Sequence, residues 1–354
     1  MFLITLTFTL ALLLSLYGVP LARRAALLFN VMDRPDGRLK LQSQPVPYFG
    51  GLAVYLAFLI SLALTFEFRQ DVLGLVLGGT LMVMLGLIDD FGVLSPWPKL
   101  IGQLIAVFVL IRSGIRIEIA AVPDWLDLLL TVLWMVGIIN AINIIDVMDG
   151  LAGGVSVIAC LWLFVVALAN QDMMIAVMLA ALAGSLLGFL RYNFFPAEIY
   201  LGDAGSLFAG FMLGALAMIG KYTVVNTVSL LAPVLILGVP IFDTFFVMYV
   251  RTLRGIPVCL GSPDHIALRL RRWALSVPQV VVLSYGVAFL SGGIGVASMF
   301  VRAEIALGLM AATSVLGVIA ALWLKRIDMS QPAERACQLE APAPAPAPAT
   351  QRMP

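Results

Sequence analysis

Long apolar runs recur along most of this chain, and they limit what it can fold into more than any other feature. A run of roughly 17 to 25 apolar residues is long enough to cross the hydrocarbon core of a bilayer as a helix. Such runs fall near residues 2–21, 48–66, 72–88, 100–115, 125–144, 153–170, 172–190, 206–220, 227–250, 279–300 and 304–324. The sequence therefore predicts an all-α integral membrane protein, a polytopic bundle of about 10–11 transmembrane helices.

The composition points the same way. Of 354 residues, 62% are hydrophobic and 12% are charged, whereas a soluble globular chain carries about 25% charged residues. The first apolar run lacks the basic start and the small-residue cleavage pattern of a signal peptide, so we interpret it as the first spanning helix. The net charge of +1 indicates no particular partner. We expect the lipid bilayer to surround the chain and expect no nucleic acid, and a homodimer stays open.

Basic residues divide unevenly between the two sides of the predicted bundle. One side holds most of them, and the other holds only Arg69, Arg112, Arg116, Lys221 and Arg302. Loops rich in lysine and arginine stay in the cytoplasm, so the N-terminus is expected outside and the C-terminus inside. This topology predicts a multi-pass membrane protein with its working face toward the cytoplasm.

The end of the chain differs from the rest in composition. Residues 327–354 finish in APAPAPAPATQRMP, a Pro/Ala segment of low complexity that cannot build a packed core. We expect a disordered or extended cytoplasmic tail there. The membrane domain, which carries the chemistry, is expected to span residues 1–326.

Aspartates stand where several apolar runs end. Asp89 and Asp90 are adjacent, and Asp146, Asp149 and Asp203 follow later runs, all on the predicted cytoplasmic side. Adjacent carboxylates at a membrane boundary repel each other unless a cation shares them or one takes up a proton. Oxygen ligands suit hard cations such as Mg²⁺, which fills its shell with water and substrate phosphates. The pattern predicts a metal and phosphate site at a membrane surface.

Two motifs with acidic residues each allow two interpretations. The segment NAINIIDVMDG spaces Asn140, Asn143, Asp146 and Asp149 by three, so that at helical pitch they share one face. Such a polar stripe either contributes to a site or joins helices together. Asp203 stands between two glycines just ahead of an apolar run, where it is either a helix N-cap or a metal ligand beside a phosphate.

Basic side chains in two predicted cytoplasmic loops are candidates for binding phosphate. Lys40 lies in DRPDGRLKLQSQPVPYFGG, where Gly50 and Gly51 open a helix and permit a close backbone approach. His265, the only histidine, lies in RTLRGIPVCLGSPDHIALRLRRW with Arg251 and Arg254. The alternatives are contacts to lipid headgroups for the basic residues, and for a lone histidine an ordinary position on the surface.

Taken together, these stretches resemble the polyprenyl-phosphate N-acetylhexosamine-1-phosphate transferases of glycosyltransferase family 4. The resemblance covers about residues 33 to 270 and rests on five ordered segments: DRPDGRLKLQSQPVPYFGG, GLIDDFGVLSPWPKLIGQ, NAINIIDVMDGLAGG, YLGDAGSLFAGF and VPIFDTFFVMYVRTLRGIPVCLGSPDHIALRL. The family includes UDP-GlcNAc:undecaprenyl-phosphate GlcNAc-1-phosphate transferases and the phospho-MurNAc-pentapeptide translocase. It implies a helical bundle with a cytoplasmic active-site cleft in a bacterial inner membrane. It also implies a UDP-N-acetylhexosamine donor, undecaprenyl phosphate as the acceptor, release of UMP, and Mg²⁺, with Mn²⁺ as the alternative ion.

The resemblance also implies roles for individual residues. Asp89, Asp90 and His265 would be catalytic, and Asp203 with Asp90 would hold the metal. The residues expected to bind substrate are Lys40, Asn143, Asp146, Asp149, Asn193, Arg251 and Arg254.

Two departures from the family pattern bear on the donor. Ala267 stands where a second histidine is common, so the triple-histidine motif of the pentapeptide translocase is absent, and Val147 and Met148 replace a Gly-Leu pair. We therefore expect UDP-GlcNAc as the donor for the first membrane step of a cell-envelope glycan pathway. Translocase activity is the alternative within the family, and an ion-coupled transporter with carboxylates that relay cations is the alternative from another class.

Overall fold

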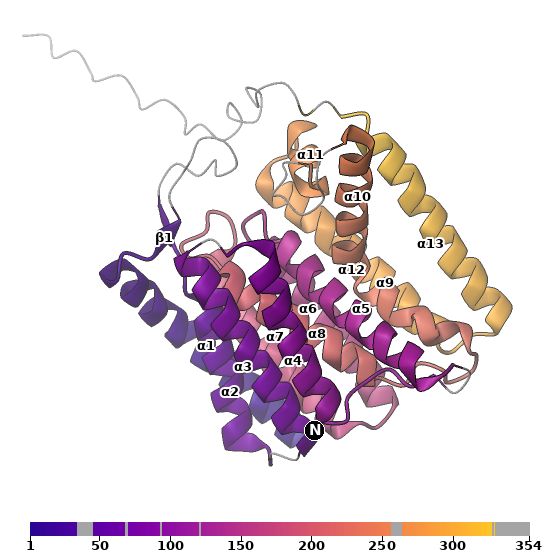
Figure 1. Ribbon diagram of the computed structural model, residues 1–354, viewed down its shortest axis with the longest axis horizontal. Coiled ribbons are helices and arrows are strands. Elements are labelled where there is room, and N and C mark those ends of the chain that lie inside the picture. Colours follow the sequence, from indigo (N-terminus) through magenta and orange to yellow (C-terminus); the bar gives the residue numbers. More distant parts are fainter. Residues whose placement is uncertain are drawn as a thin grey trace, which may run out of the picture.

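The computed structural model describes residues 1–33, 45–67, 70–92, 94–119, 122–255, 264–327 and 329, and Figure 1 shows them as a bundle of helices. The described residues contain one two-stranded sheet, in which β1 (Met32–Asp33) pairs antiparallel with β2 (Val46–Pro47). Lys40 lies outside the described residues, as does nearly all of the predicted tail. The all-α prediction is confirmed.

Eight helices of the described part are long and apolar enough to cross a membrane. They are α1 (Phe2–Leu28), α3 (Gln70–Phe91), α5 (Asp124–Ile144), α6 (Leu151–Ala169), α7 (Met173–Asn193), α8 (Gly202–Ile219), α12 (Val277–Ser298) and α13 (Ala303–Leu324). The remaining helices are α2 (Gly50–Thr65), α4 (Pro96–Arg112), η1 (Val228–Leu231), α9 (Ala232–Ile236), α10 (Gly238–Arg254) and α11 (Ile266–Arg272). The chain is a multi-pass membrane protein.

The predicted span near residues 227–250 is bent rather than continuous. The short helices η1 and α9 end at Ile236, and α10 leaves at an angle of 79° to them. Pro240 has no N–H to donate to the carbonyl of Ile236, and Gly238 at the break tolerates a turn. If this bent pair is taken as one span, up to nine spans pass the test among the described residues.

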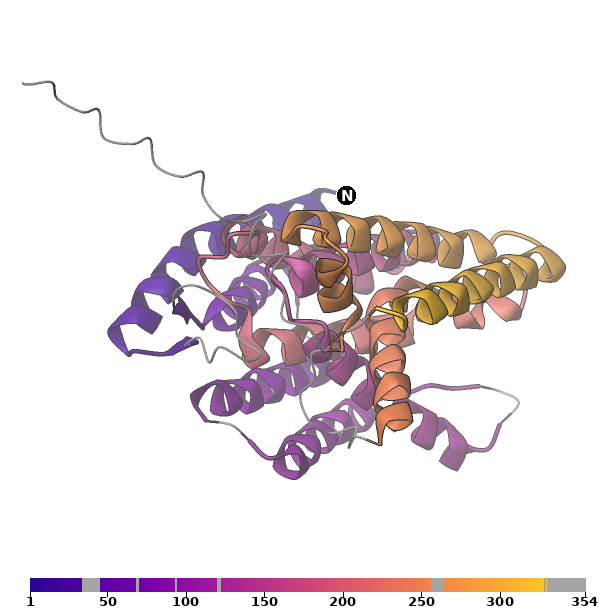
Figure 2. The same cartoon turned by 90° about the horizontal axis from the view of Figure 1, so that it is seen from above.

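Helix α8 is the centre of the bundle. Within its apolar window 83% of the residues are buried, whereas only 11% are in α13, which Figure 2 shows at the edge of the molecule. Helices α2, α3 and α5 all pack on α8. A polar side chain at the first turn of α8 is therefore surrounded by the ends of other helices.

The start of α2 is joined to the start of α8. The N–H of Gly50 donates to Tyr200 O at 3.1 Å, and that of Gly51 donates to Leu201 O at 2.9 Å. A Cβ on Gly51 would come within 2.1 Å of the nitrogen of Gly205. The predicted close backbone approach at Gly50 and Gly51 is confirmed, and it holds the first turn of α8 in place.

Candidate active site

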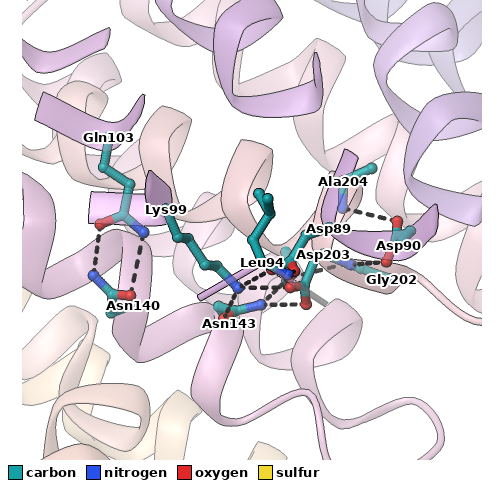
Figure 3. A network of polar contacts seen from close by, with 11 residues as sticks. Asp89, Asp90, Leu94, Lys99, Gln103, Asn140, Asn143, Gly202, Asp203 and Ala204 are labelled. Atoms are coloured by element: carbon teal, nitrogen blue, oxygen red, sulfur yellow. Dashed lines mark hydrogen bonds and ion pairs between the residues drawn. The ribbon is translucent and has the colours of Figure 1, made fainter. Parts of the chain in front are cut away.

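The aspartates of two motifs meet where α3 ends and α8 begins; we call this end of the bundle the acidic end. Asp89 and Asp90 lie in the last turn of α3, and Asp203 lies in the first turn of α8. Helix α4 adds Lys99 from its first turn, and α5 adds Asn143 from its last turn. Figure 3 shows the side chains of Asp89, Lys99, Asn143 and Asp203 directed toward one another, whereas Asp90 is directed at the backbone where α8 begins.

Lys99 lies between the carboxylates of Asp89 and Asp203. Its Nζ is 2.8 Å from Asp89 Oδ2 and 2.6 Å from Asp203 Oδ2, and it donates to Asn143 Oδ1 at 3.1 Å. We call Asp89, Lys99, Asn143 and Asp203 the Lys99 cluster. Its oxygen atoms converge on a single cation, which reduces the repulsion between the carboxylates.

The amide and the carboxylates of the cluster are held by further hydrogen bonds. Asn143 Nδ2 donates to Asp203 Oδ1 at 2.8 Å and to Ser206 Oγ at 2.9 Å. Asp89 Oδ1 accepts the backbone N–H of Leu94 at 2.7 Å. The N–H of Leu94 thus fixes one oxygen of Asp89, and the amide of Asn143 fixes one oxygen of Asp203. The other oxygen of each carboxylate stays directed at Lys99.

Asp90 has a different environment from its neighbour. Its Oδ1 accepts the N–H of Asp203 at 2.8 Å and its Oδ2 that of Ala204 at 3.2 Å, at the positive end of the α8 dipole. Gly202 has φ +70, and a Cβ there would lie 2.7 Å from Asp90 Oδ2. A Cβ on Gly86 would lie 2.3 Å from Ala204 Cα, so this close contact of α3 and α8 requires glycine. Asp90 anchors the start of α8, and its role as a metal ligand stays a prediction.

The polar stripe from Asn140 to Asp149 does not share one helical face, and that expectation is wrong. Helix α5 ends at Ile144, so Asp146 and Asp149 lie in the turn that follows. Asn140 exchanges hydrogen bonds with Gln103 of α4, at 2.9 and 3.2 Å. For Asn140 the alternative of a contact between helices is confirmed, and Asn143 alone of the four enters the Lys99 cluster.

Asp149 and Asn193 hold the segment that leads into α8. Asp149 Oδ2 accepts the N–H of Ala197 at 2.9 Å. Asn193 accepts the N–H of Gly150 at 3.0 Å and donates to Ile199 O at 3.0 Å. These contacts position the loop beside the site, and the predicted binding of substrate by both residues is a separate question that stays a prediction.

The pKa of the Asp146 carboxyl depends on its burial and on the aspartates around it. Burial raises the pKa of its carboxyl to about 8, and the negative charges of Asp203, Asp90 and Asp149 add to the effect. The neighbouring carboxylates therefore disfavour a further negative charge at Asp146, and a cation bound at the acidic end would reduce this repulsion.

His265 and Arg254 pair with aspartates that do not belong to the Lys99 cluster. His265 Nδ1 lies 2.8 Å from Asp243 Oδ2, and Arg254 pairs with Asp264 at 2.9 Å. His265 is 7% exposed and Arg251 is 3% exposed, so the alternative of a surface histidine is wrong. Among the hydrogen bonds of the described residues, none joins His265 to the Lys99 cluster. The predicted roles of His265, Arg251 and Arg254 stay predictions.

Lys99 is the site residue that the sequence did not single out. In the sequence analysis, Lys99 contributed only as one of the basic residues from which the membrane topology was predicted. A usable signal was present: it follows the aspartate pair closely, in SPWPKL, where the prolines start a new helix. A short connection between two helices returns the first turn of α4 to the end of α3.

The donor set of the Lys99 cluster fits a hard cation. Asp89, Asp203 and Asn143 offer carboxylate and amide oxygens around one point. Within the part of the chain that the structure describes, no three His, Cys, Asp or Glu side chains form a complete metal cage. A site of few protein ligands suits Mg²⁺, which completes its shell with water and substrate phosphates.

Comparison with known proteins identifies the family. The model of glycosyl transferase family 4 matches residues 72–221, which include the whole Lys99 cluster. A Bacillus subtilis protein, named as a probable undecaprenyl-phosphate N-acetylglucosaminyl 1-phosphate transferase, is 35% identical over 296 residues, 81% of this chain and 82% of its own. This chain belongs to glycosyl transferase family 4.

Other members of the family are similar over most of their length. A Mycolicibacterium smegmatis decaprenyl-phosphate N-acetylglucosaminephosphotransferase is 28% identical over 78% of this chain and 77% of its own. A Halalkalibacterium halodurans phospho-N-acetylmuramoyl-pentapeptide-transferase is 32% identical over 80% of this chain and 93% of its own. The resemblance to the polyprenyl-phosphate hexosamine-1-phosphate transferases is confirmed, and the family member described here is a phosphosugar transferase.

Proposed function

We propose that this protein transfers GlcNAc-1-phosphate from UDP-GlcNAc to undecaprenyl phosphate and releases UMP. The observation that carries the proposal is the convergence of Asp89, Asp203 and Asn143 on Lys99 at the end of the bundle. We place this site at the cytoplasmic face of a bacterial inner membrane, because the basic loops lie at the same end. The product would enter a cell-envelope glycan pathway.

The reaction joins two anions. An oxygen of the acceptor phosphate attacks the β-phosphorus of the donor, the bond from that phosphorus to the bridging oxygen breaks, and UMP leaves with that oxygen. The acceptor phosphate is already largely ionised at neutral pH, so a general base is not required. Catalysis then depends on positioning and on neutralising charge.

The Lys99 cluster offers the groups that such a step needs. The Lys99 ammonium can pair with phosphate oxygens when it leaves one of its two carboxylates. Asp89, Asp203 and Asn143 would hold Mg²⁺, which when bound neutralises the diphosphate and stabilises the departing UMP. Asp90, through its hydrogen bonds to the start of α8, keeps Asp203 in place.

Two observations support this function over the alternatives. The single histidine favours a donor without a peptide, because the triple-histidine motif of the translocase branch is absent. The carboxylates of the cluster lie at helix ends, whereas carboxylates that couple ions in transporters lie near the membrane midplane.

The test uses the purified full-length protein in detergent with undecaprenyl phosphate. UMP release is measured with UDP-GlcNAc and with UDP-MurNAc-pentapeptide, each with Mg²⁺ and with excess EDTA. We expect a higher kcat/KM for UDP-GlcNAc, and no release in EDTA until Mg²⁺ is restored. A higher value for the pentapeptide donor would overturn the donor assignment, and undiminished transfer in EDTA would overturn the metal requirement. No release from either donor would overturn the transferase proposal.

A further inference from the structure

A groove between α1 and α7 is a second feature of this molecule that carries charge next to apolar surface. Its volume is about 510 Å³, within the usual range of pockets for small molecules. Leu13, Leu16 and Leu21 of α1 form an apolar wall, and Arg24 and Arg191 belong to its lining. Neither helix contributes a side chain to the Lys99 cluster, so the groove is separate from the candidate active site.

The sequence of α7 explains why the two helices touch and then separate. Gly184 and Gly188 allow α1 to pack closely, since a Cβ on Gly184 would lie 2.5 Å from Phe8 O, and one on Gly188 would lie 2.6 Å from Ser15 Cβ. One helical turn further along the same face stands Tyr192, which belongs to the lining of the groove. The groove opens at this point.

Pro20 fixes the wall of the groove. Inside α1 it has no N–H, so the carbonyl of Leu16 loses its helical donor. Tyr192 Oη donates to that carbonyl at 3.0 Å. The tyrosine is thereby held across the groove, and the opening is built into the packing of α1 on α7.

Two arginines line the mouth of the groove. Arg24 follows Pro20 by one turn, and the Arg191 guanidinium lies 5.8 Å from the centre of the Tyr192 ring. Among the described residues neither has an ion-pair partner, whereas the adjacent Arg23 pairs with Glu198 at 2.9 Å. The two guanidinium groups of Arg24 and Arg191 are therefore suited to bind an anion.

We propose that the groove binds an anionic glycerophospholipid, with its phosphate between Arg24 and Arg191 and an acyl chain along the leucines of α1. Tyr17 is 74% exposed and Leu21 is 62% exposed, so the apolar wall opens onto the hydrocarbon of the membrane. Arginines at a helix end reach the headgroup level, where anionic lipids offer phosphates. The lining of the groove shares no residue with the Lys99 cluster, which favours a structural lipid over the acceptor substrate.

Native mass spectrometry of the delipidated full-length protein, titrated with phosphatidylglycerol or phosphatidylcholine, tests the proposal. We expect a preference for phosphatidylglycerol and, in the Arg24→Gln/Arg191→Gln variant, affinity about 30-fold weaker, since an arginine near an anionic surface contributes about 1 kcal/mol and a tenfold change about 1.4 kcal/mol. Arg23→Gln is the matched control, because it removes a charge that Glu198 already neutralises. Arg24→Lys/Arg191→Lys keeps both charges and should retain binding.

Three results would overturn the proposal. One is unchanged phosphatidylglycerol binding in the double glutamine variant, and another is equal binding of phosphatidylcholine by the wild type. The third is displacement of phosphatidylglycerol by an equal concentration of undecaprenyl phosphate, together with loss of undecaprenyl phosphate binding in the double glutamine variant, which would make the groove an acceptor site. Because the readout is lipid binding without UDP-sugar, it does not depend on the transferase proposal.

Discussion

The Lys99 cluster and the Asp264–Arg269 pair both join carboxylates to cations, yet their charge balance is opposite. In the first, the ammonium of Lys99 serves the two carboxylates of Asp89 and Asp203. In the second, two guanidinium groups serve one carboxylate: Arg254 and Arg269 lie 2.9 and 2.6 Å from Asp264. The Lys99 cluster therefore has fewer cations than carboxylates, whereas Asp264 has more cations than its single carboxylate requires.

This difference separates a site for ligands from a structural contact. Arg269 is fully buried, and it also donates to the carbonyls of Leu324 at 3.2 Å and Ile327 at 2.9 Å. It therefore joins α11 to the end of α13, and all of these partners come from the chain itself. Buried charges persist only when paired and hydrogen-bonded. The proposed binding of a cation and phosphates by the Lys99 cluster rests on its shortage of positive charge, which the Asp264–Arg269 pair does not have.

Removing Arg269 should produce the largest effect on stability. Arg269→Met leaves Asp264 buried without its closest cation, a change that costs about 3–5 kcal/mol in buried pairs. The thermal unfolding transition of the purified protein should fall by several degrees. Arg254→Gln removes the half-exposed partner of the same carboxylate and should cost less than about 1 kcal/mol. Equal decreases in the unfolding temperature for Arg269→Met and Arg254→Gln would contradict the distinction between the buried and the half-exposed partner of Asp264.

Removing a carboxylate from the Lys99 cluster should instead affect turnover. Asp203→Asn and Asp89→Asn keep the size of the side chain, and we expect UMP release to fall by about 100- to 1,000-fold, the usual effect of losing one electrostatic contact to a transition state. The unfolding temperature should change little. Asp172→Asn is the matched control, because Asp172 caps α7 through the N–H of Ile175 and Asn caps equally well. Near-normal turnover in both cluster variants would show that the site lies elsewhere.

Two asparagines one turn apart on α5 offer a finer test. Asn143→Leu removes the amide from the Lys99 cluster, so activity should fall by about 10- to 100-fold, in line with one lost charge-assisted hydrogen bond. Asn140→Leu leaves Gln103 buried without its partner, at a cost of about 1–3 kcal/mol in stability. Its kcat should remain near that of the wild type. The comparison fails if Asn140→Leu loses as much activity as Asn143→Leu.

The smallest expected effect concerns the cation itself. Lys99→Met leaves Asp89 and Asp203 without a shared cation, so added Mg²⁺ should raise its unfolding temperature more than that of the wild type. At ten times its Kd a ligand contributes about 1.4 kcal/mol. Lys325→Met, which removes an exposed lysine near Tyr249, is the matched control. An equal Mg²⁺ response in all three proteins would mean that the oxygen atoms of the cluster do not bind the ion.

Several particular elements could be predicted from sequence because the membrane makes local pattern informative. Backbone groups in hydrocarbon must bond within their own helix, so apolar length alone locates α1, α3 and α13. The aspartates could be placed at helix ends for the same reason, since charge is costly inside the bilayer. The bend between α9 and α10 was missed, because the apolar run continues through Gly238 and Pro240 without a break.

The sequence by itself determined an all-helical membrane protein, its family, and the motifs that supply Asp89 and Asp203. For Asn143 it left two interpretations open, a place in the site or a contact between helices. Only the tertiary structure decided what the polar side chains contact: Asp90 anchors α8, and Lys99 joins Asp89, Asn143 and Asp203 in the candidate site. The physical reason is the distance along the sequence over which each kind of interaction acts. Helix formation and membrane insertion depend on residues close in sequence, whereas the contacts of Lys99 join α3, α4, α5 and α8, and their geometry follows from how those helices pack on one another.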